Sequence, residues 1–485
     1  MILVLDEGTS STRALLFADD GAIAHVAQAD LPATYPQPGW VEQDPKLIWD
    51  RSRQVMAAAV AAAGGPGKVG AIGIANQRET VVAWDRTSGA PLAPAIVWQD
   101  RRTAAACDAL REAGHEPALQ AQTGLLLDPY FSATKMRWLL DHHAAVREAA
   151  AAGRLALGTV DAWLLFKLTG RHASDASNAS RTLLMDLEKV AWDAGLCDLF
   201  GVPREALPEI VPTAGELGTT DLFGGAIAVT GSAGDQQAAT IGQACLAPGR
   251  AKATFGTGLF ALAPTGATPA RSRHRLLSTL LSHDGTSAAY ALEGAVFVAG
   301  SLVKWLRDMA GLVEHAEETE ALARSVEDSG GVTIIPAFTG LGAPHWRADL
   351  TGSIHGLTFG VGRAHLVRAA LEAVTMSAHD LGRAFAADGA AWTSLRIDGG
   401  MARNDWFAQD LADILAIGVE RPANIESTAR GAAMLAAVGA GRFASLEEAC
   451  AMQPRRDRFT PAMAPDARAA RLDRWHAALD HALAR

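Results

Sequence analysis

The stretch ILVLDEGTSSTRALLF, residues 2–17, consists of two short apolar runs joined by a Gly/Ser/Thr segment. Apolar runs on either side of a small polar turn predict a β-hairpin with a polar tip. The next segment, 43–64, predicts a helix with Asp44 as N-cap and Pro45 in the first position. Two more apolar runs, 69–75 and 80–84, predict strands. This alternation is typical of an α/β sheet covered by helices.

A similar pattern recurs about 250 residues later. AKATFGTGLFALAPTG (251–266) again has two apolar runs around a small Gly-Thr-Gly turn. A chain of 485 residues is too long for one ordinary core. We therefore expect two similar domains, 1–246 and 247–485, divided at LAPGR (246–250). If the domains face each other, both glycine-rich tips lie at one cleft, which is a suitable place for a polyphosphate.

The composition excludes several classes of protein. A formal net charge of −10 leaves no basic surface for nucleic acid. The N-terminus lacks the basic region of a signal peptide, and no apolar run approaches the roughly 18 residues of a membrane span. Four widely spaced cysteines are typical of reduced thiols that serve packing. We expect a cytoplasmic protein with no nucleic-acid or membrane partner.

Common catalytic motifs are absent or incomplete. GTGLFA (256–261) fits a dinucleotide-binding fingerprint, but a strand-like run and Pro264 follow it instead of a helix. GGPGKVG (64–70) lacks the spacing of a phosphate-binding Walker loop. The sequence contains neither HExxH nor GxSxG, and the adjacent His142 and His143 are typical of a solvated helix end. A metalloprotease or a serine hydrolase is therefore poorly supported.

Polar residues instead gather where predicted strands end. Arg78 and Glu79 follow one apolar run, Trp98 follows another, and Asp235 follows 226–229. Each has an ordinary alternative: Arg78 and Glu79 as a surface ion pair, and Asp235 as a helix N-cap. Two further residues, Asp6 after the first strand and Tyr130 in a proline turn, also have alternatives, as a turn-forming acid and a loop aromatic. Only their joint occurrence points to a site.

Many segments along the chain resemble the glycerol kinase branch of the FGGY carbohydrate kinase family. In order, they are LDEGTSSTR (5–13), YPQPGWVEQDP (35–45), GIANQRET (73–80), AIVWQDRRT (95–103), DPYFSATK (128–135), NASRTLLMDL (178–187), GDQQAA (234–239), FGTGLF (255–260), YALEGAVFVAG (290–300), PAFTGLGAPHW (336–346) and DGGMARND (398–405). Both family signature patterns resemble 130–142 and 352–372. The resemblance covers nearly the whole chain and is specific, because many segments agree in order and spacing.

The resemblance implies an α/β fold of two actin-like (ribonuclease H-like) ATPase domains, with ATP bound between them. It also implies phosphorylation of glycerol. The implied glycerol-binding residues are Arg78, Glu79, Tyr130, Asp235 and Gln236, with Trp98 and Phe260 as apolar walls. The implied ATP-binding residues are Thr9, Ser10, Ser11 and Arg13 on the first tip, Thr257 on the second, and Gly300, Gly400 and Asn404 beside the nucleoside.

Two acids receive roles in the implied reaction. Asp235 is the expected general base, which accepts the proton of the attacking hydroxyl. Asp6 is expected to anchor Mg²⁺, through water. An N-cap role for Asp235 is compatible with catalysis, because a helix start can fix the direction of a carboxylate.

The sequence departs from the family pattern in three places. Lys304 stands where a nucleotide-contacting Gln is common, and Glu7 replaces a commoner Gln. Segment 219–231 lacks the basic glycine loop through which some members bind fructose 1,6-bisphosphate, so that regulation is in doubt. A homodimer is one possible assembly. Two other functions stay open: an FGGY kinase for another small polyol or ketose, and an actin-like ATPase without a sugar acceptor.

Overall fold

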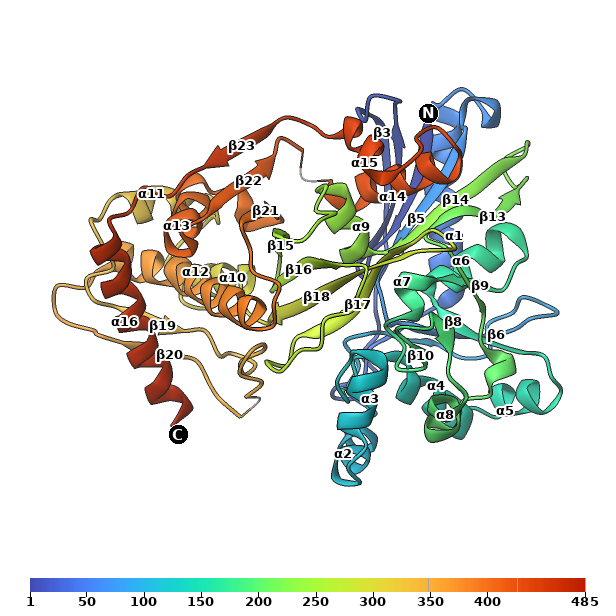
Figure 1. Cartoon of the computed structure of the whole chain (residues 1–485), viewed down its shortest axis with the longest axis horizontal. Helices are drawn as coiled ribbons and strands as arrows, with labels where there is room; N and C mark the ends of the chain where they lie inside the picture. Colours follow the sequence, from blue (N-terminus) through green and yellow to red (C-terminus); the bar gives the residue numbers. More distant parts are fainter. Residues whose placement is uncertain (348, 425, 485) are drawn as a thin grey trace.

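The computed structural model describes residues 1–347, 349–424 and 426–484. Within these ranges each half of the chain builds one large mixed sheet. Figure 1 shows the blue-to-green half on one side and most of the yellow-to-red half on the other, with the orange-red helices α14 (Ser427–Gly439) and α15 (Leu446–Ala449) lying against the first half. The first sheet has the spatial order β13 (Ala214–Thr220), β14 (Ile227–Gly234), β5 (Ala71–Asn76), β1 (Ile2–Glu7), β2 (Ser11–Phe17) and β3 (Ile23–Asp30).

The second sheet repeats this arrangement. Its order is β17 (Leu277–His283), β18 (Ala288–Val296), β16 (Leu259–Gly266), β15 (Arg250–Phe255), β21 (Ser394–Asp398), β22 (Gly418–Pro422) and β23 (Arg456–Phe459). In both sheets a hairpin begins the unit, two parallel strands follow, and an antiparallel strand closes the edge. The predicted hairpins are confirmed, and the strand order repeats in the two halves with β17 as an additional strand in the second sheet.

The first long helix also agrees with the sequence. It is α1 (Pro45–Ala62), and the side chain of its N-cap, Asp44, accepts a hydrogen bond from the Lys46 amide at 2.8 Å. Pro45 occupies the first turn, where a missing N–H costs nothing. The predicted apolar face, which includes Ile48 and Val55, is buried against the first sheet.

A smaller region is inserted into the first half, and it carries several of the expected site residues. Its sheet has the order β4 (Glu42–Gln43), β7 (Ala95–Ile96), β6 (Val81–Asp85) and β8 (Leu155–Thr159). The helices around it are α2 (Ala104–Glu112), α3 (Glu116–Thr123), α4 (Ser132–His142), α5 (Ala144–Ala151), α6 (Val160–Thr169), α7 (Ala176–Ala179) and α8 (Ala194–Phe200). Short strands β9 (Ala173–Asp175), β10 (Met185–Asp186), β11 (Ala191–Trp192) and β12 (Glu209–Val211) complete it.

Two helices from different halves cross at the centre of the molecule. They are α9 (Asp235–Gly242) and α14 (Ser427–Gly439), which lie side by side in Figure 1. A Cβ at Gly431 would overlap the Ala238 carbonyl, and a Cβ at Gly242 would overlap the Ser427 carbonyl. Glycine is therefore required for this close approach. Although α14 comes from the second half, it packs against β14, β5 and β1, so the layer over the first sheet contains residues from both halves.

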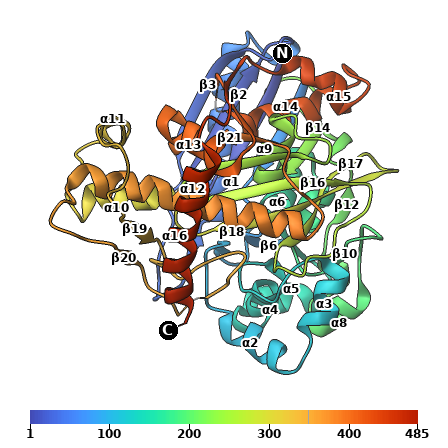
Figure 2. The ribbon, with the colours of Figure 1, turned by 60° about the vertical axis from the view of Figure 1, so that its left-hand side comes forward.

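The remaining helices cover the second sheet. They are α10 (Gly300–Asp308), α11 (Glu318–Arg324), α12 (Arg363–Ala387), α13 (Asp405–Leu415) and α16 (Pro465–Leu483), with the short strands β19 (Thr333–Ile335) and β20 (Ser353–His355) nearby. The short helix α15 (Leu446–Ala449) instead follows α14 and packs with it in the core of the first sheet. Figure 2 shows α16 running across α12. In the part of the chain that is described, none of the helices is both long and apolar enough to cross a membrane. All four cysteines are free, as expected.

Candidate active site

The ends of three parallel strands bring the expected polar residues to one edge of the first sheet. β1, β5 and β14 run parallel, and Asp6, Ala75 and Ala233 lie in one row across them. Asp6 is near the end of β1, Arg78 and Glu79 follow β5, and Asp235 follows β14. The carboxyl ends of parallel strands are the usual position of ligand sites in α/β sheets.

Arg78 is the centre of a buried network. Its Nη1 donates to Glu293 Oε2 at 2.5 Å and to Gln237 Oε1 at 3.3 Å. Its Nη2 donates to Glu293 Oε1 at 3.0 Å and to the Tyr130 hydroxyl at 3.3 Å, and Nε lies 3.2 Å from Asp235 Oδ1. Arg78 is only 3% exposed. Both Nη atoms of the guanidinium therefore have two partners each, and a substrate hydroxyl that binds to either of them has to displace one of these contacts.

Glu79 is held beside Arg78 by a second arginine. Arg181 Nε donates to Glu79 Oε1 at 2.7 Å, and Arg181 Nη2 donates to Glu293 Oε1 at 3.1 Å. Glu79 has φ 61°, a left-handed conformation that is uncommon for a residue with a side chain. Burial raises the pKa of Glu79, while Arg78 and Arg181 oppose that shift. Backbone strain of this kind persists where surrounding contacts fix it, and it is frequent at functional sites.

Asp235 stands at the open side of the network. Its side chain is 37% exposed, whereas those of Arg78 and Glu293 are at most 2% exposed. The expected N-cap role is wrong: the N-cap of α9 is Gly234, and Asp235 is the first helical residue. Its Oδ1 accepts a hydrogen bond from the adjacent Gln236 amide at 2.7 Å and lies 3.2 Å from Arg78 Nε. Burial raises the pKa of Asp235, and the charges of Arg78 and Lys252 partly offset that rise.

Gln236 is oriented by a buried lysine of the second sheet. Lys252 Nζ donates to Gln236 Oε1 at 2.6 Å, and Lys252 is fully buried on β15. Burial lowers the pKa of Lys252, and the nearby charges of Asp398 and Asp235 oppose that shift. The expected glycerol-binding amide is therefore tied to the second half of the chain.

The expected aromatic walls differ in how closely they join this network. The rings of Trp98 and Tyr130 meet edge to face with centroids 5.6 Å apart. Lys135, buried in α4, donates from Nζ to the Tyr130 carbonyl at 2.8 Å and so fixes that turn. Phe260 is half-buried on β16, where the strand register places it on the same sheet face as Glu293. Phe260 thus faces the site from the opposite half.

The two glycine-rich tips have the form that the sequence predicted. In the first, Gly8 N donates to Ser11 O at 3.0 Å, and Thr9 Oγ1 accepts from Trp98 Nε1 at 3.0 Å. Ser10 is exposed at this tip, and so is Thr257 at the other. Gly300 N donates to Gly256 O at 2.8 Å, and a Cβ at Gly300 would lie 2.5 Å from that oxygen. Gly300 is therefore packed on the second tip.

Asp6 and Arg13 form an ion pair across the first hairpin. Arg13 Nη1 also lies 2.8 Å from Glu426 Oε2, which comes from the start of α14. Burial raises the pKa of Asp6, and Arg13 opposes the shift. Both residues are thus at the edge where the two halves meet.

Gly400 and Asn404 lie on the second half, after β21. Gly400 is exposed, and a side chain there would meet no atom within 4 Å among the described residues. Asn404 is the N-cap of α13: its Oδ1 accepts from Phe407 N at 2.9 Å, and its Nδ2 donates to Thr319 Oγ1 at 3.3 Å. Both polar atoms of the Asn404 side chain therefore already have hydrogen-bond partners in the protein. A nucleoside that contacts Asn404 would have to bind beside these partners or replace one of them.

Reasoning from the sequence missed Glu293, Arg181, Gln237 and Lys252. Glu293 and Lys252 are lone charges inside apolar runs, YALEGAV (290–296) and AKATF (251–255). A charge within a buried strand is costly unless it has a partner, so these two positions carried a usable signal. Arg181 had no such signal, because its surroundings are polar.

Comparison with known proteins agrees with this geometry. The chain matches the N-terminal domain of the FGGY family of carbohydrate kinases over residues 1–242 and the C-terminal domain over 251–440. It is 50% identical to a glycerol kinase of Aromatoleum aromaticum, over 99% of this chain and 98% of that protein. It is 51% identical to one of Rhodospirillum centenum, over 99% and 97%.

A solved structure shows the same fold. Plasmodium falciparum glycerol kinase with ADP superposes with a TM-score of 0.94 at 34% identity, over 100% of this chain and 98% of that one. A xylulose kinase from Brucella ovis superposes with a TM-score of 0.89 at 26% identity, over 99% of each chain. The two-domain actin-like ATPase fold is thereby confirmed. The chain belongs to the FGGY family of carbohydrate kinases.

Proposed function

We propose that this protein transfers the γ-phosphoryl group of ATP to glycerol, which gives glycerol 3-phosphate and ADP. The observation that carries the proposal is the partly open carboxylate of Asp235, next to the buried Arg78 network and directly after the carboxyl end of β14. Full-length relatives at about 50% identity are glycerol kinases, and a structural neighbour holds ADP. Both facts support this substrate pair.

Asp235 is the proposed general base. As the terminal hydroxyl oxygen of glycerol attacks the γ-phosphorus, its proton passes to an Asp235 carboxylate oxygen. The new O–P bond forms while the bond between the γ-phosphorus and the bridging oxygen breaks, and that oxygen leaves with ADP. Phosphoryl transfer needs mainly positioning and neutralisation of charge, so one oriented carboxylate suffices. The raised pKa of Asp235 makes it a better proton acceptor than an ordinary aspartate.

The other two hydroxyls bind to the polyol set, defined as Arg78, Glu79, Tyr130 and Gln236. Arg78 supplies donors and Glu79 an acceptor, which together match the two-way hydrogen bonding of a hydroxyl. Trp98 and Phe260 then contact the carbon chain. Since both Nη atoms of Arg78 already have partners, binding at either of them exchanges a protein contact for a substrate contact. These partners keep the Arg78 side chain ordered before glycerol arrives.

ATP binds across the two tips in this proposal. Backbone and hydroxyl groups at Thr9, Ser10, Ser11 and Thr257 contact the phosphates, and Arg13 pairs with their charge. Gly300, Gly400 and Asn404 flank the nucleoside. The chemistry of the donor set fits Mg²⁺, because Asp6 and Asp235 are carboxylates at one sheet edge and this ion binds one or two carboxylates with phosphates and water. When bound, the ion neutralises charge on the phosphates.

A coupled assay of ADP formation, run with a panel of acceptors, tests the proposal. Glycerol should give the highest kcat/KM, with tetritols and pentuloses far lower. A preference for one of those acceptors would instead support another FGGY activity. Turnover that is equal with and without an acceptor would support an ATPase. The cytoplasmic location and the homodimer stay predictions from the sequence.

A further inference from the structure

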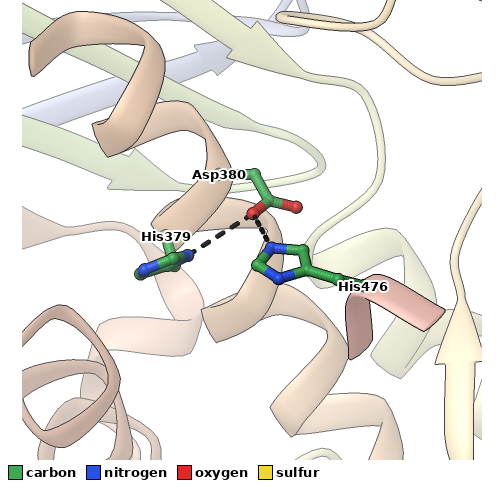
Figure 3. Close-up of side chains that lie close together, drawn as sticks. All are labelled: His379, Asp380 and His476. Atoms are coloured by element: carbon green, nitrogen blue, oxygen red, sulfur yellow. Dashed lines mark hydrogen bonds and ion pairs between the residues drawn. The ribbon is translucent and has the colours of Figure 1, made fainter. Parts of the chain in front are cut away.

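A second cluster of ionisable side chains lies far along the chain from the polyol set, between α12 and α16. Figure 3 shows the Asp380 carboxylate with the His379 and His476 rings directed toward it. His476 Nε2 lies 3.0 Å from Asp380 Oδ1, and His379 Nδ1 lies 3.4 Å from the same oxygen. The three candidate ligand atoms lie within 4.8 Å of one another. Among the described residues this is the one such group of His, Cys, Asp and Glu that can hold a metal ion.

The spacing matches a tetrahedral metal site. Metal–nitrogen and metal–oxygen bonds of about 2.0–2.1 Å place neighbouring ligand atoms about 3.3 Å apart. The two measured separations at Asp380 Oδ1 are 3.0 and 3.4 Å, on either side of that value. The His379 and His476 ring centroids are 6.1 Å apart, so the two rings would move closer together on binding one tetrahedral ion. Two imidazoles and one carboxylate are ligands that Zn²⁺ accepts.

The surroundings fix the cluster from outside. Trp475 Nε1 donates to the other carboxylate oxygen, Asp380 Oδ2, at 2.6 Å. His379 and Asp380 are 8% and 9% exposed, while the His476 side chain is 32% exposed and leaves the site accessible to an ion. An outer hydrogen bond that orients a carboxylate ligand is a regular part of metal sites.

We propose that His379, Asp380 and His476 form a site for one divalent transition-metal ion, with Zn²⁺ as the best chemical fit, that fastens α16 to α12. The helix α16 already buries Trp475, Ala478 and Leu479 in the hydrophobic core of the second half. A metal bond between the helices would add a fixed link to this apolar contact. Since the three ligands contribute nothing to the Arg78 network, the site is structural and does not take part in phosphoryl transfer.

The test uses the purified full-length protein after treatment with a chelator. Zn²⁺ is added in competition with a chromophoric indicator, and Co²⁺ is added separately while its visible spectrum is recorded. We expect one equivalent of tightly bound metal, a four-coordinate Co²⁺ spectrum and a thermal midpoint that rises with Zn²⁺, because the ion binds only the folded chain. If the protein failed to bind one equivalent of Zn²⁺ at micromolar concentration, the proposal would be wrong.

Variants separate this site from ordinary surface binding. His476→Gln keeps an N–H for Asp380 and is partly exposed, so it should fold; its Zn²⁺ Kd should rise by more than 100-fold. Trp475→Phe removes the outer hydrogen bond together with part of a buried ring, and it should raise the Kd by about 10–100-fold. Unchanged binding in His476→Gln would overturn the proposal.

Two controls address other histidines. His315→Gln changes an exposed histidine elsewhere and should bind Zn²⁺ normally. His481→Gln tests the neighbouring His355–His481 ring pair, whose centroids are 5.8 Å apart. If His481→Gln lost the metal and His476→Gln retained it, the ion would belong to that pair and the assignment would be wrong.

Discussion

Arg78 from the first half of the chain and Glu293 from the second form a buried two-point ion pair, with N–O distances of 2.5 and 3.0 Å. Glu293 also accepts from Arg181. Burial opposes the charged form of Glu293, but Arg181 and Arg78 outweigh it and lower its pKa to about 2. The polyol set is thus assembled by contact between the halves.

Glu293→Gln should destabilise the protein strongly. The change leaves two buried guanidinium groups short of a negative charge, and breaking a buried pair in this way costs about 3–5 kcal/mol. The loss of stability is measured as the change in the free energy of unfolding in urea. Glu209→Gln is the matched control, because its pair with Arg171 is on the surface and should contribute at most about 1 kcal/mol. Equal losses in the two variants would contradict the importance of the pair.

Asp235→Asn should keep the fold and glycerol binding but lower kcat by about 10²–10⁴, the range expected on loss of a general base. Steady-state kinetics and glycerol binding by calorimetry, on the same preparation, provide the measurement. Asp221→Asn, in an exposed turn, serves as control. An Asp235→Asn enzyme with most of its normal kcat would rule out the proposed base.

Lys252→Met should lower kcat/KM for glycerol by about 10–100-fold, because Gln236 loses a charged hydrogen-bond partner. A second effect separates electrostatics from packing. The Lys252 charge lowers the pKa of Asp235, so its removal should raise that pKa and move the acidic limb of the kcat/KM profile to higher pH. A lower rate with an unmoved profile would leave Lys252 with a packing role alone.

Glu7→Gln should change how stability depends on pH. Burial raises the pKa of Glu7 to about 8, its Oε2 accepts from Ser52 at 2.7 Å, and its Oε1 has no hydrogen-bond partner among the described residues. The folded chain then holds a proton that the unfolded chain releases between pH 4.5 and 8. Stability therefore falls as pH rises through that window, by up to about 1.4 kcal/mol per unit.

Glutamine has the shape of the protonated acid and does not titrate. The variant should match the parent near pH 5 and be the more stable of the two at pH 9, as measured by urea unfolding at both values. Parallel profiles would show that Glu7 is charged in the folded state.

Local patterns in the sequence were enough to predict much of the fold. Apolar runs around polar turns located both hairpins, and Asp44–Pro45 located the start of α1, because caps and strand periodicity depend on residues close in the chain. The apolar run 226–229 predicted that Asp235 follows a strand, and the resemblance supplied the family. These features could be predicted because each is determined by a few residues that are neighbours in the sequence.

The tertiary structure alone decided the rest. Arg78 and Glu293 are separated by 215 positions, and Arg181 lies 102 from its partner Glu79. The crossing of α14 over the first sheet and the use of Gly234, not Asp235, as the cap of α9 also depend on packing. A buried charge is stable only where another part of the chain brings the opposite charge within hydrogen-bond distance. The residues next to the charge in the sequence do not identify that partner.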